Sequence, residues 1–229
     1  MNLIPLFKDD ELLNRYKRLR EIGSNQNTHL VTLVPRAALL ECGKKLGLVQ
    51  GKALVLDNEE ELSILFDYCL YNYRRGGKNI IERYLETSPT LATADEMILL
   101  KGKLNSYYSL FSIQEVHRGR GATLRDILRN KTLFLMDLGI GKSAAPGLLF
   151  AGRVIPLAEF HMTTGTFIPV SNKGLIEKGI MPIVNKFLQH SKPAGDSIFS
   201  PGQEAALAAQ IIRVLLRAGS LDRMIYQDI

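Results

Sequence analysis

The hydrophobic period of the chain changes at Tyr107, and this change constrains the fold more than any other feature. Up to about residue 106, apolar residues recur every three to four positions, which is the spacing of amphipathic helices. From residue 107 to residue 170 the period shortens to two, the spacing of strands with one buried face. After Ser171 the helical period returns. The sequence therefore predicts an α+β protein.

Three regions follow from this change of period: a helical region (1–106), a five-stranded barrel-like region (107–170) and a C-terminal helical region (171–229). Residues 1–170 are expected to form one compact unit. The 229 residues are 46% hydrophobic and 23% charged, so the chain has enough apolar surface for a core without disulfide bonds.

Helices are expected at residues 10–22, 35–46, 58–73, 78–86 and 94–104, and again at 174–189 and 201–218. Capping pairs mark three of their starts: Asp57 with Glu60, Thr93 with Glu96, and Ser200 with Gln203. Strands are expected at residues 110–117, 122–129, 133–138, 148–157 and 159–170. Because closure removes exposed edges, short strands with hairpin-length turns favour a small antiparallel β-meander curled into a barrel. Its first and last strands would then be neighbours, with the N-terminal helices packed on it and two C-terminal helices extending the body.

The cysteines and the apolar runs indicate the cellular compartment of the protein. Cys42 and Cys69 are too few for a disulfide framework and lie in helical patterns, so we expect reduced core residues. No apolar run approaches the roughly 18 residues of a membrane-spanning helix. The expected location is the cytoplasm, without membrane contact.

Positive charge is concentrated in the middle of the chain. Residues 101–170 hold nine Lys and Arg against four Asp and Glu, whereas residues 1–100 are nearly balanced. The cluster expected on one barrel edge consists of Arg118, Arg120, Arg125, Arg129 and Lys131. Such a cluster can neutralise nucleic-acid phosphates, and Tyr107 or Tyr108 could stack on bases. The alternative is a solvated turn whose charges are paired with Glu115 and Asp126.

A repeated Glu-x-His pattern gives a second candidate site. Glu115 with His117 and Glu159 with His161 each place a carboxylate and an imidazole on one face of a strand. If the first and last strands are neighbours, the four side chains could hold zinc or iron in a metal-dependent enzyme. Polar strand ends facing water are the simpler alternative. Otherwise no cofactor is expected, and no catalytic nucleophile can be named.

The last expected helix (201–218) is apolar on more than one side. Only Gln203, Gln210, Arg213 and Arg217 form a polar stripe. Such a helix is either enclosed within its own chain or shared with another, and the polar linker 190–198 favours a shared helix. A homodimer through this helix is therefore expected.

A resemblance covers roughly residues 30–170. It is carried by Phe66-Asp67-Tyr68, Tyr108-Ser109-Leu110-Phe111, Gly119-Arg120-Gly121, Ala145-Pro146-Gly147 and Met162-Thr163-Thr164-Gly165. On these segments the chain resembles a group of uncharacterised bacterial proteins, some relatives of which look as though they carry a SecA-type zinc-binding tail. This chain has no cysteine after Cys69, so the resemblance implies no zinc function.

These observations favour a non-enzymatic binding protein whose ligand is RNA or another nucleic acid. A homodimeric protein-protein adaptor is the first alternative, and a metal-dependent enzyme is the second.

Overall fold

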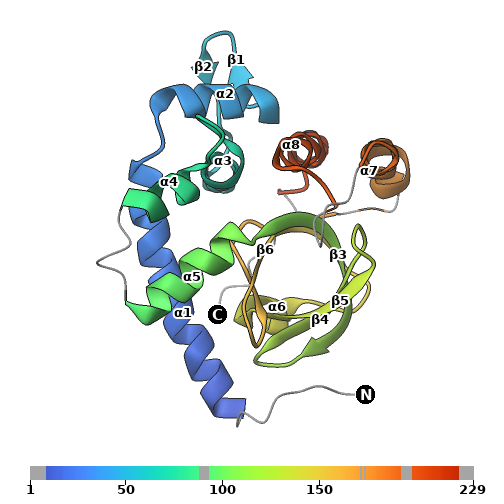
Figure 1. Ribbon diagram of the computed structural model, residues 1–229. Helices are drawn as coiled ribbons and strands as arrows, with labels where there is room; N and C mark the ends of the chain where they lie inside the picture. Colours follow the sequence, from blue (N-terminus) through green and yellow to red (C-terminus); the bar gives the residue numbers. More distant parts are fainter. Residues whose placement is uncertain (1–8, 88–92, 171, 173, 192–197, 222–229) are drawn as a thin grey trace.

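The computed structural model describes residues 9–87, 93–170, 172, 174–191 and 198–221 (Figure 1). Within these ranges the chain runs through helices, a small closed β-barrel and then helices again. The expected α+β class with a small central barrel is confirmed.

The N-terminal region is helical except for one short hairpin. Its helices are α1 (Asp9–Thr32), α2 (Arg36–Leu46), α3 (Glu59–Asn72), α4 (Ile80–Thr87) and α5 (Ala94–Leu104), and the hairpin pairs β1 (Val49–Gln50) with β2 (Ala53–Leu54). Helix α1 runs ten residues beyond its expected end because Gly23 does not stop it. A Cβ at Gly23 would lie 3.1 Å from Leu99, so the glycine lets α5 pack closely against α1.

The capping pairs were mostly predicted correctly. The boxes of Thr93 with Glu96 and of Ser200 with Gln203 are both formed, which confirms them. The start of α3 is different, because its cap is Asn58, whose side chain accepts a hydrogen bond from the Glu61 amide at 2.9 Å. The Glu61 carboxylate in turn accepts from the Asp57 amide at 2.8 Å. The box is therefore shifted by one residue.

The barrel consists of β3 (Tyr107–His117), β4 (Gly121–Asp126), β5 (Lys131–Met136), β6 (Leu149–Pro156) and β7 (His161–Thr163). The strand order is β3-β4-β5-β7-β6, and β6 pairs back onto β3 to close it. A short additional strand, β8 (Ile168–Pro169), pairs with β6. The last expected strand is thus split in two.

The closure differs from a simple antiparallel meander. The first strand meets the fourth, not the last, and β7 lies between β5 and β6, parallel to β5. The connection after β5 contains helix α6 (Leu138–Ser143), and β6 then pairs with β3 rather than with β5. The free edges of β5 and β6 are joined by β7, which lies between them. A closed five-stranded barrel with this order, and with a helix between its third and fourth strands, has the connectivity of the OB-fold.

The barrel interior is filled with apolar side chains. The buried side chains include Phe111, Leu124, Leu135 and Val154. Ala144, the residue that follows α6, packs against them. Gly141 of α6 approaches the β3–β4 turn so closely that a Cβ would lie 2.6 Å from the Gly121 amide nitrogen. Helix α6 therefore closes the barrel end at which this turn lies.

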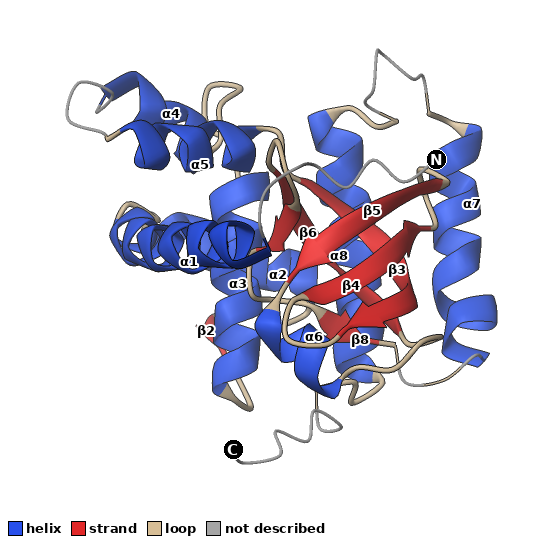
Figure 2. Cartoon of the chain, turned by 90° about the horizontal axis from the view of Figure 1, so that it is seen from below, coloured by secondary structure: helices blue, strands red, loops and turns tan. Residues whose placement is uncertain are grey.

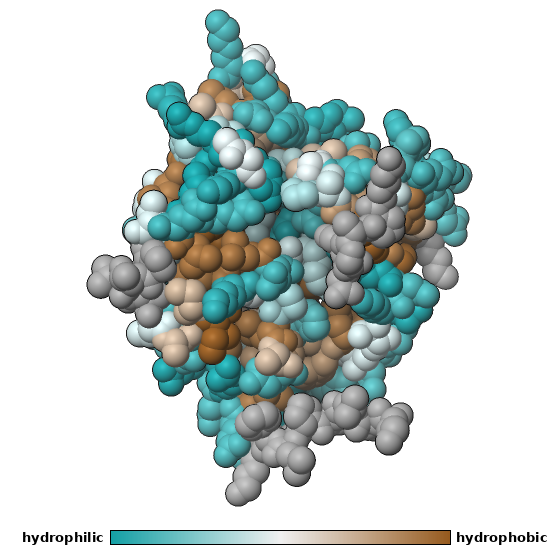
Figure 3. All heavy atoms as spheres, in the orientation of Figure 1, coloured by the Kyte–Doolittle hydropathy of each residue, from teal (hydrophilic) through white to brown (hydrophobic). Residues whose placement is uncertain are grey.

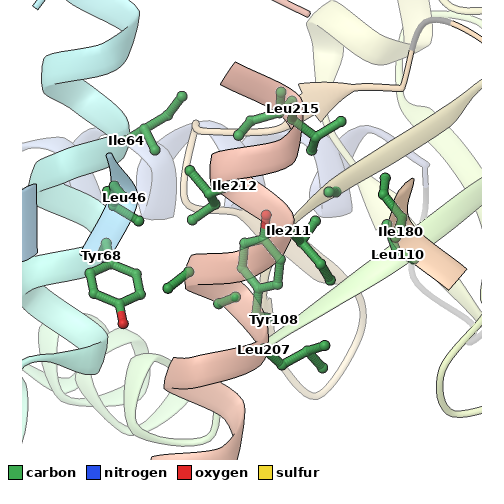
Figure 4. Packing of buried hydrophobic residues seen from close by; sticks show 14 of the residues in the cluster. Leu46, Ile64, Tyr68, Tyr108, Leu110, Ile180, Leu207, Ile211, Ile212 and Leu215 are labelled. Atoms are coloured by element: carbon green, nitrogen blue, oxygen red, sulfur yellow. The ribbon is translucent and has the colours of Figure 1, made fainter. Parts of the chain in front are cut away.

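The C-terminal helices share one hydrophobic core with α2, α3 and the barrel. A π-helical turn (Leu175–Ile180) leads into α7 (Met181–Gln189), and α8 (Pro201–Arg217) follows. Figure 4 shows α8 between side chains of α2 and α3 on one side and of β3 and the π-helical turn on the other. Leu207, Ile211 and Leu215 are fully buried within the single chain.

The expectation that α8 has an uncovered apolar side is therefore wrong. It is apolar on both sides because it is a central layer between the N-terminal helices and the barrel. Residues 192–197 of the linker expected before it lie outside the described residues.

Helices pack on part of the barrel surface and leave the side of β4 and β5 without a helix outside it (Figure 1). Figure 2 shows α1, α4 and α5 on one side of the strands and α7 on the other. On the face in Figure 3, hydrophilic residues dominate around α2 and the β1–β2 hairpin, and hydrophobic ones come to the surface nearer the middle. In the described ranges, no helix combines the length and the apolar character needed to cross a membrane.

Candidate functional site

The outer face of β4 and β5 is the candidate site. Along these strands Leu124, Leu133 and Leu135 fill the barrel, so the alternating residues face outward. The outward residues include Thr123, Arg125, Thr132 and Phe134. In OB-type barrels the corresponding face, together with the first hairpin loop and the loop between the fourth and fifth strands, binds oligonucleotides or oligosaccharides.

An aromatic pair, His117 and Phe134, lies on this face, and Phe134 also packs against the hydrophobic cluster that α1 forms with the barrel. The His117 ring lies edge-on to Phe134, with centroids 5.4 Å apart, and its Nε2 lies 2.7 Å from the Thr123 hydroxyl. His161 of β7 is in register with Leu135, whose side chain fills the barrel, so its ring lies on the inner side of the sheet. Burial lowers the pKa of His161, although a hydrogen bond that its ring donates to the Phe134 backbone carbonyl opposes this. His117 and Phe134 are half-buried and present flat ring surfaces on the outer face.

Basic residues flank the aromatic pair at both ends of the strands. Arg118 and Arg120 lie in the turn between β3 and β4, and the Arg118 guanidinium donates to the Lys142 carbonyl. At the opposite end, Arg125 of β4 donates to the Asn130 side chain, and the exposed Lys131 begins β5. Strand β4 has 6 residues, so the two ends are separated by about 17 Å. The expected clustering on a single edge is therefore wrong, because these residues bracket a face.

Arg129 is turned away from this face. Its guanidinium lies 3.7 Å from the Tyr107 ring centroid, and it forms an ion pair of 3.5 Å with Asp126. Only 10% of its side chain is exposed, and the Asp126 carboxylate also accepts from the Ser109 hydroxyl at 2.5 Å. Arg129 therefore holds the β4–β5 turn against β3 and is a poor phosphate ligand.

The two Glu-x-His pairs do not meet. Glu115 and His117 lie on β3, whereas His161 lies on β7, and β6 separates these two strands on one side and β4 and β5 on the other. Glu159 forms an ion pair with Arg15 of α1 at 3.3 Å. The described part of the chain contains no group of three or more His, Cys, Asp or Glu side chains suited to a metal ion. The expectation that the pairs come together is wrong, because the barrel closes through β6.

A buried charge network, which sequence reasoning missed, joins the barrel to the helices. Arg153 of β6 is 2% exposed and forms an ion pair of 2.9 Å with Glu204 of α8. Its Nε lies 4.0 Å from the Asp67 carboxylate of α3, and its guanidinium lies over the Tyr71 ring. Burial acts to lower the pKa of Arg153, but the carboxylates of Glu204 and Asp67 outweigh this and raise it. Arg153 therefore remains charged and ties three elements together.

The prediction from the sequence missed Phe134 and Arg153, although each has a recognisable pattern around it. Phe134 is a large apolar residue on the polar side of an alternating strand, with Leu133 and Leu135 on the other side. Arg153 is a lone charge inside an apolar strand pattern, and a charge at such a position is paired when it is buried.

The fold and this surface define the class of protein: a helical protein built around an OB-type barrel with an aromatic and basic outer face. The chain belongs to a family of unknown function (DUF7986), which matches residues 10–197. Neither the curated proteins nor the solved structures include a match. This membership agrees with the resemblance to uncharacterised proteins.

Proposed function

We propose that the protein binds single-stranded nucleic acid on the outer face of β4 and β5. The observation that carries the proposal is the position of Phe134 beside the His117 imidazole on this face, with basic side chains at both ends of the strands. An aromatic side chain that stacks on a base contributes about 1–3 kcal/mol and tolerates any sequence. Arg and Lys around it add affinity by neutralising phosphates.

The alternative of a merely solvated, charge-paired turn receives less support. Asp126 and Glu115 were the acids expected to pair with the surface arginines. The Asp126 side chain is buried against Ser109 and Arg129, so it does not neutralise Arg125. Glu115 lies opposite Thr123, so it is an acid on the outer face itself, where the basic residues outnumber it.

The other two functions lack a specific observation in their favour. The apolar sides of α8 are covered within the chain, so a dimer is not needed to bury them. The four residues of the suggested metal site lie on separate parts of the barrel. A non-enzymatic role in nucleic-acid binding is the function that the geometry supports best.

The salt dependence of binding tests this proposal. For a single-stranded 12-mer, four phosphate contacts (Arg118, Arg120, Arg125 and Lys131) predict a slope of log K against log [salt] of about −3. Replacing Arg118 and Arg120 together by Gln should reduce the slope to about −1.5, because two contacts are lost. Fluorescence anisotropy with labelled RNA and DNA oligonucleotides at several salt concentrations measures both slopes.

The matched control replaces Arg36 and Lys52 by Gln, which removes the same charge from exposed positions on α2 and the β1–β2 hairpin. We expect this variant to keep the wild-type slope. Equal slopes for all three proteins, or no binding by the wild type, would rule out this face as the binding surface.

A further inference from the structure

A cavity of about 500 Å³ lies between α1 and the segment that follows β7, away from the face described above. Helices α3 and α5 and strand β6 supply the rest of its wall. Sites for small organic molecules commonly measure about 300–1,000 Å³. The cavity is therefore large enough for a ligand the size of a sugar phosphate or a mononucleotide.

Two cationic side chains line this cavity, and neither has a carboxylate partner in the described ranges. Lys103 of α5 is 2% exposed, and its Nζ donates a hydrogen bond to the Asn27 side chain at 2.7 Å. Arg20 of α1 donates through Nη1 to the Thr163 carbonyl at 2.9 Å, while its Nη2 faces Gly165. An ammonium group has three hydrogens and a guanidinium has five, so both keep donors for a ligand.

The acid in the cavity wall is already engaged. Asp67 faces Arg153 at 4.0 Å, and the hydroxyl groups of Thr164 and Thr166, which lie 3.2 Å from each other, act with Arg153 to stabilise its carboxylate form. Burial raises the pKa of Asp67, although Arg153 and the two threonines oppose this. Asp67 therefore does not neutralise both cations, and the cavity carries an excess of positive charge.

This arrangement disfavours the charged form of the Lys103 amine. Burial lowers the pKa of this amine to about 7 and outweighs the opposing effect of the Asp67 carboxylate. A buried ammonium group without a counter-ion is unfavourable, so a bound anion would stabilise its charged form. Phe66, Leu70, Leu99 and Met162 also line the cavity and provide apolar surface for the organic part of a ligand.

We propose that this cavity binds a small organic phosphate, with the phosphate group held by Arg20 and Lys103. Two cations match the charge of a phosphate dianion, and the Arg fork suits its oxygens. Hydroxyl groups of Ser24, Thr28 and the threonines after β7 line the same cavity and can bond to the remaining ligand oxygens. This site is independent of the proposed nucleic-acid surface.

Isothermal titration calorimetry with ribose 5-phosphate, AMP and inorganic phosphate tests the proposal. We expect at least one phosphate ester to bind the wild-type protein with one site per chain. Arg20→Gln and Lys103→Met should each weaken binding tenfold or more, because each removes a charged hydrogen-bond donor. Lys17→Gln and Lys101→Met, exposed positions on the same two helices, should bind as the wild type does.

The pH dependence distinguishes the two cations. Between pH 6 and pH 8.5 the Lys103 amine loses its proton, so the wild-type affinity should fall by about tenfold relative to Lys103→Met. Arg20→Gln should bind more weakly at every pH but keep this fall. Thermal unfolding of each variant shows whether it is folded.

Three results would overturn the proposal: no binding of any phosphate, equal binding by the wild type and both cavity variants, or binding of a carboxylate such as malonate in preference to every phosphate. Loss of oligonucleotide binding in the Arg118 and Arg120 variant would leave the cavity proposal unaffected, so the two proposals fail separately.

Discussion

Replacing Arg153 by Met is expected to lower the free energy of unfolding by about 3–5 kcal/mol. The guanidinium is the counter-ion of Glu204, at 2.9 Å, and lies 4.0 Å from Asp67, so its loss leaves two buried carboxylates without a cation. It also removes hydrogen bonds to Asn72 and Ser106, which lie on α3 and before β3. Urea unfolding followed by circular dichroism measures the change.

A second substitution separates the charge effect from the loss of packing. Adding Glu204→Gln to Arg153→Met removes one of the stranded charges, so the double variant should regain about 1 kcal/mol or more. Arg36→Met, at an exposed position of α2, is the control and should change stability by less than about 0.5 kcal/mol. If Arg153→Met unfolded like the control, Arg153 would not join the barrel to the helices as described.

Replacing Lys103 by Met is expected to raise the free energy of unfolding in ligand-free buffer, with the largest gain at low pH. Burial lowers the pKa of Lys103 to about 7 in the folded protein, whereas the unfolded chain has the ordinary value of 10.5. The unfolded state therefore binds more protons between pH 7 and pH 10.5, and the contribution of Lys103 makes the wild type more stable as the pH rises.

The difference between Lys103→Met and the wild type should accordingly shrink by on the order of 2 kcal/mol between pH 7 and pH 9. Urea unfolding at both pH values measures it, with Lys101→Met as the control on the exposed side of α5. A difference that stayed constant with pH would mean that the folded state does not depress the pKa of Lys103.

The elements of the fold could be predicted from the sequence because their patterns are local. Helix α5 has its expected bounds, since the Thr93 and Glu96 box fixes its start. The order of the barrel strands could not be predicted in the same way. The strand order depends on the path that the chain takes through α6 and on which strand edges remain unpaired. A hydrophobic period of two shows which face of a strand is buried, but not which strands pair with it.

The candidate site was predicted only in part. Arg118, Arg120, Arg125 and Lys131 follow from charge counting, but their arrangement around a face follows from the strand order. Arg129 has the same charge and is nevertheless turned inward, because Tyr107 and Asp126 lie within its reach. The cavity was missed because Arg20, Asp67 and Lys103 come from three helices that are far apart in the sequence.

The dimer expectation was an inference from one helix in isolation. The sequence of α8 shows that two of its sides need cover, but not that its own chain provides both. Tyr68 of α3 donates from its hydroxyl to the Ala205 carbonyl of α8, and Tyr108 of β3 lies in the same hydrophobic cluster. These long-range contacts are invisible in a local pattern.

Photocrosslinking is the most direct test of the central claim that nucleic acid binds to the outer face of β4 and β5. A single-stranded RNA carrying 4-thiouridine would be irradiated with the full-length protein, and the crosslinked peptides identified by mass spectrometry. We expect crosslinks at His117 or Phe134, and their loss in Phe134→Leu, which keeps apolar volume but removes the aromatic face. Crosslinks confined to other surfaces, or an unchanged yield in Phe134→Leu, would contradict the claim.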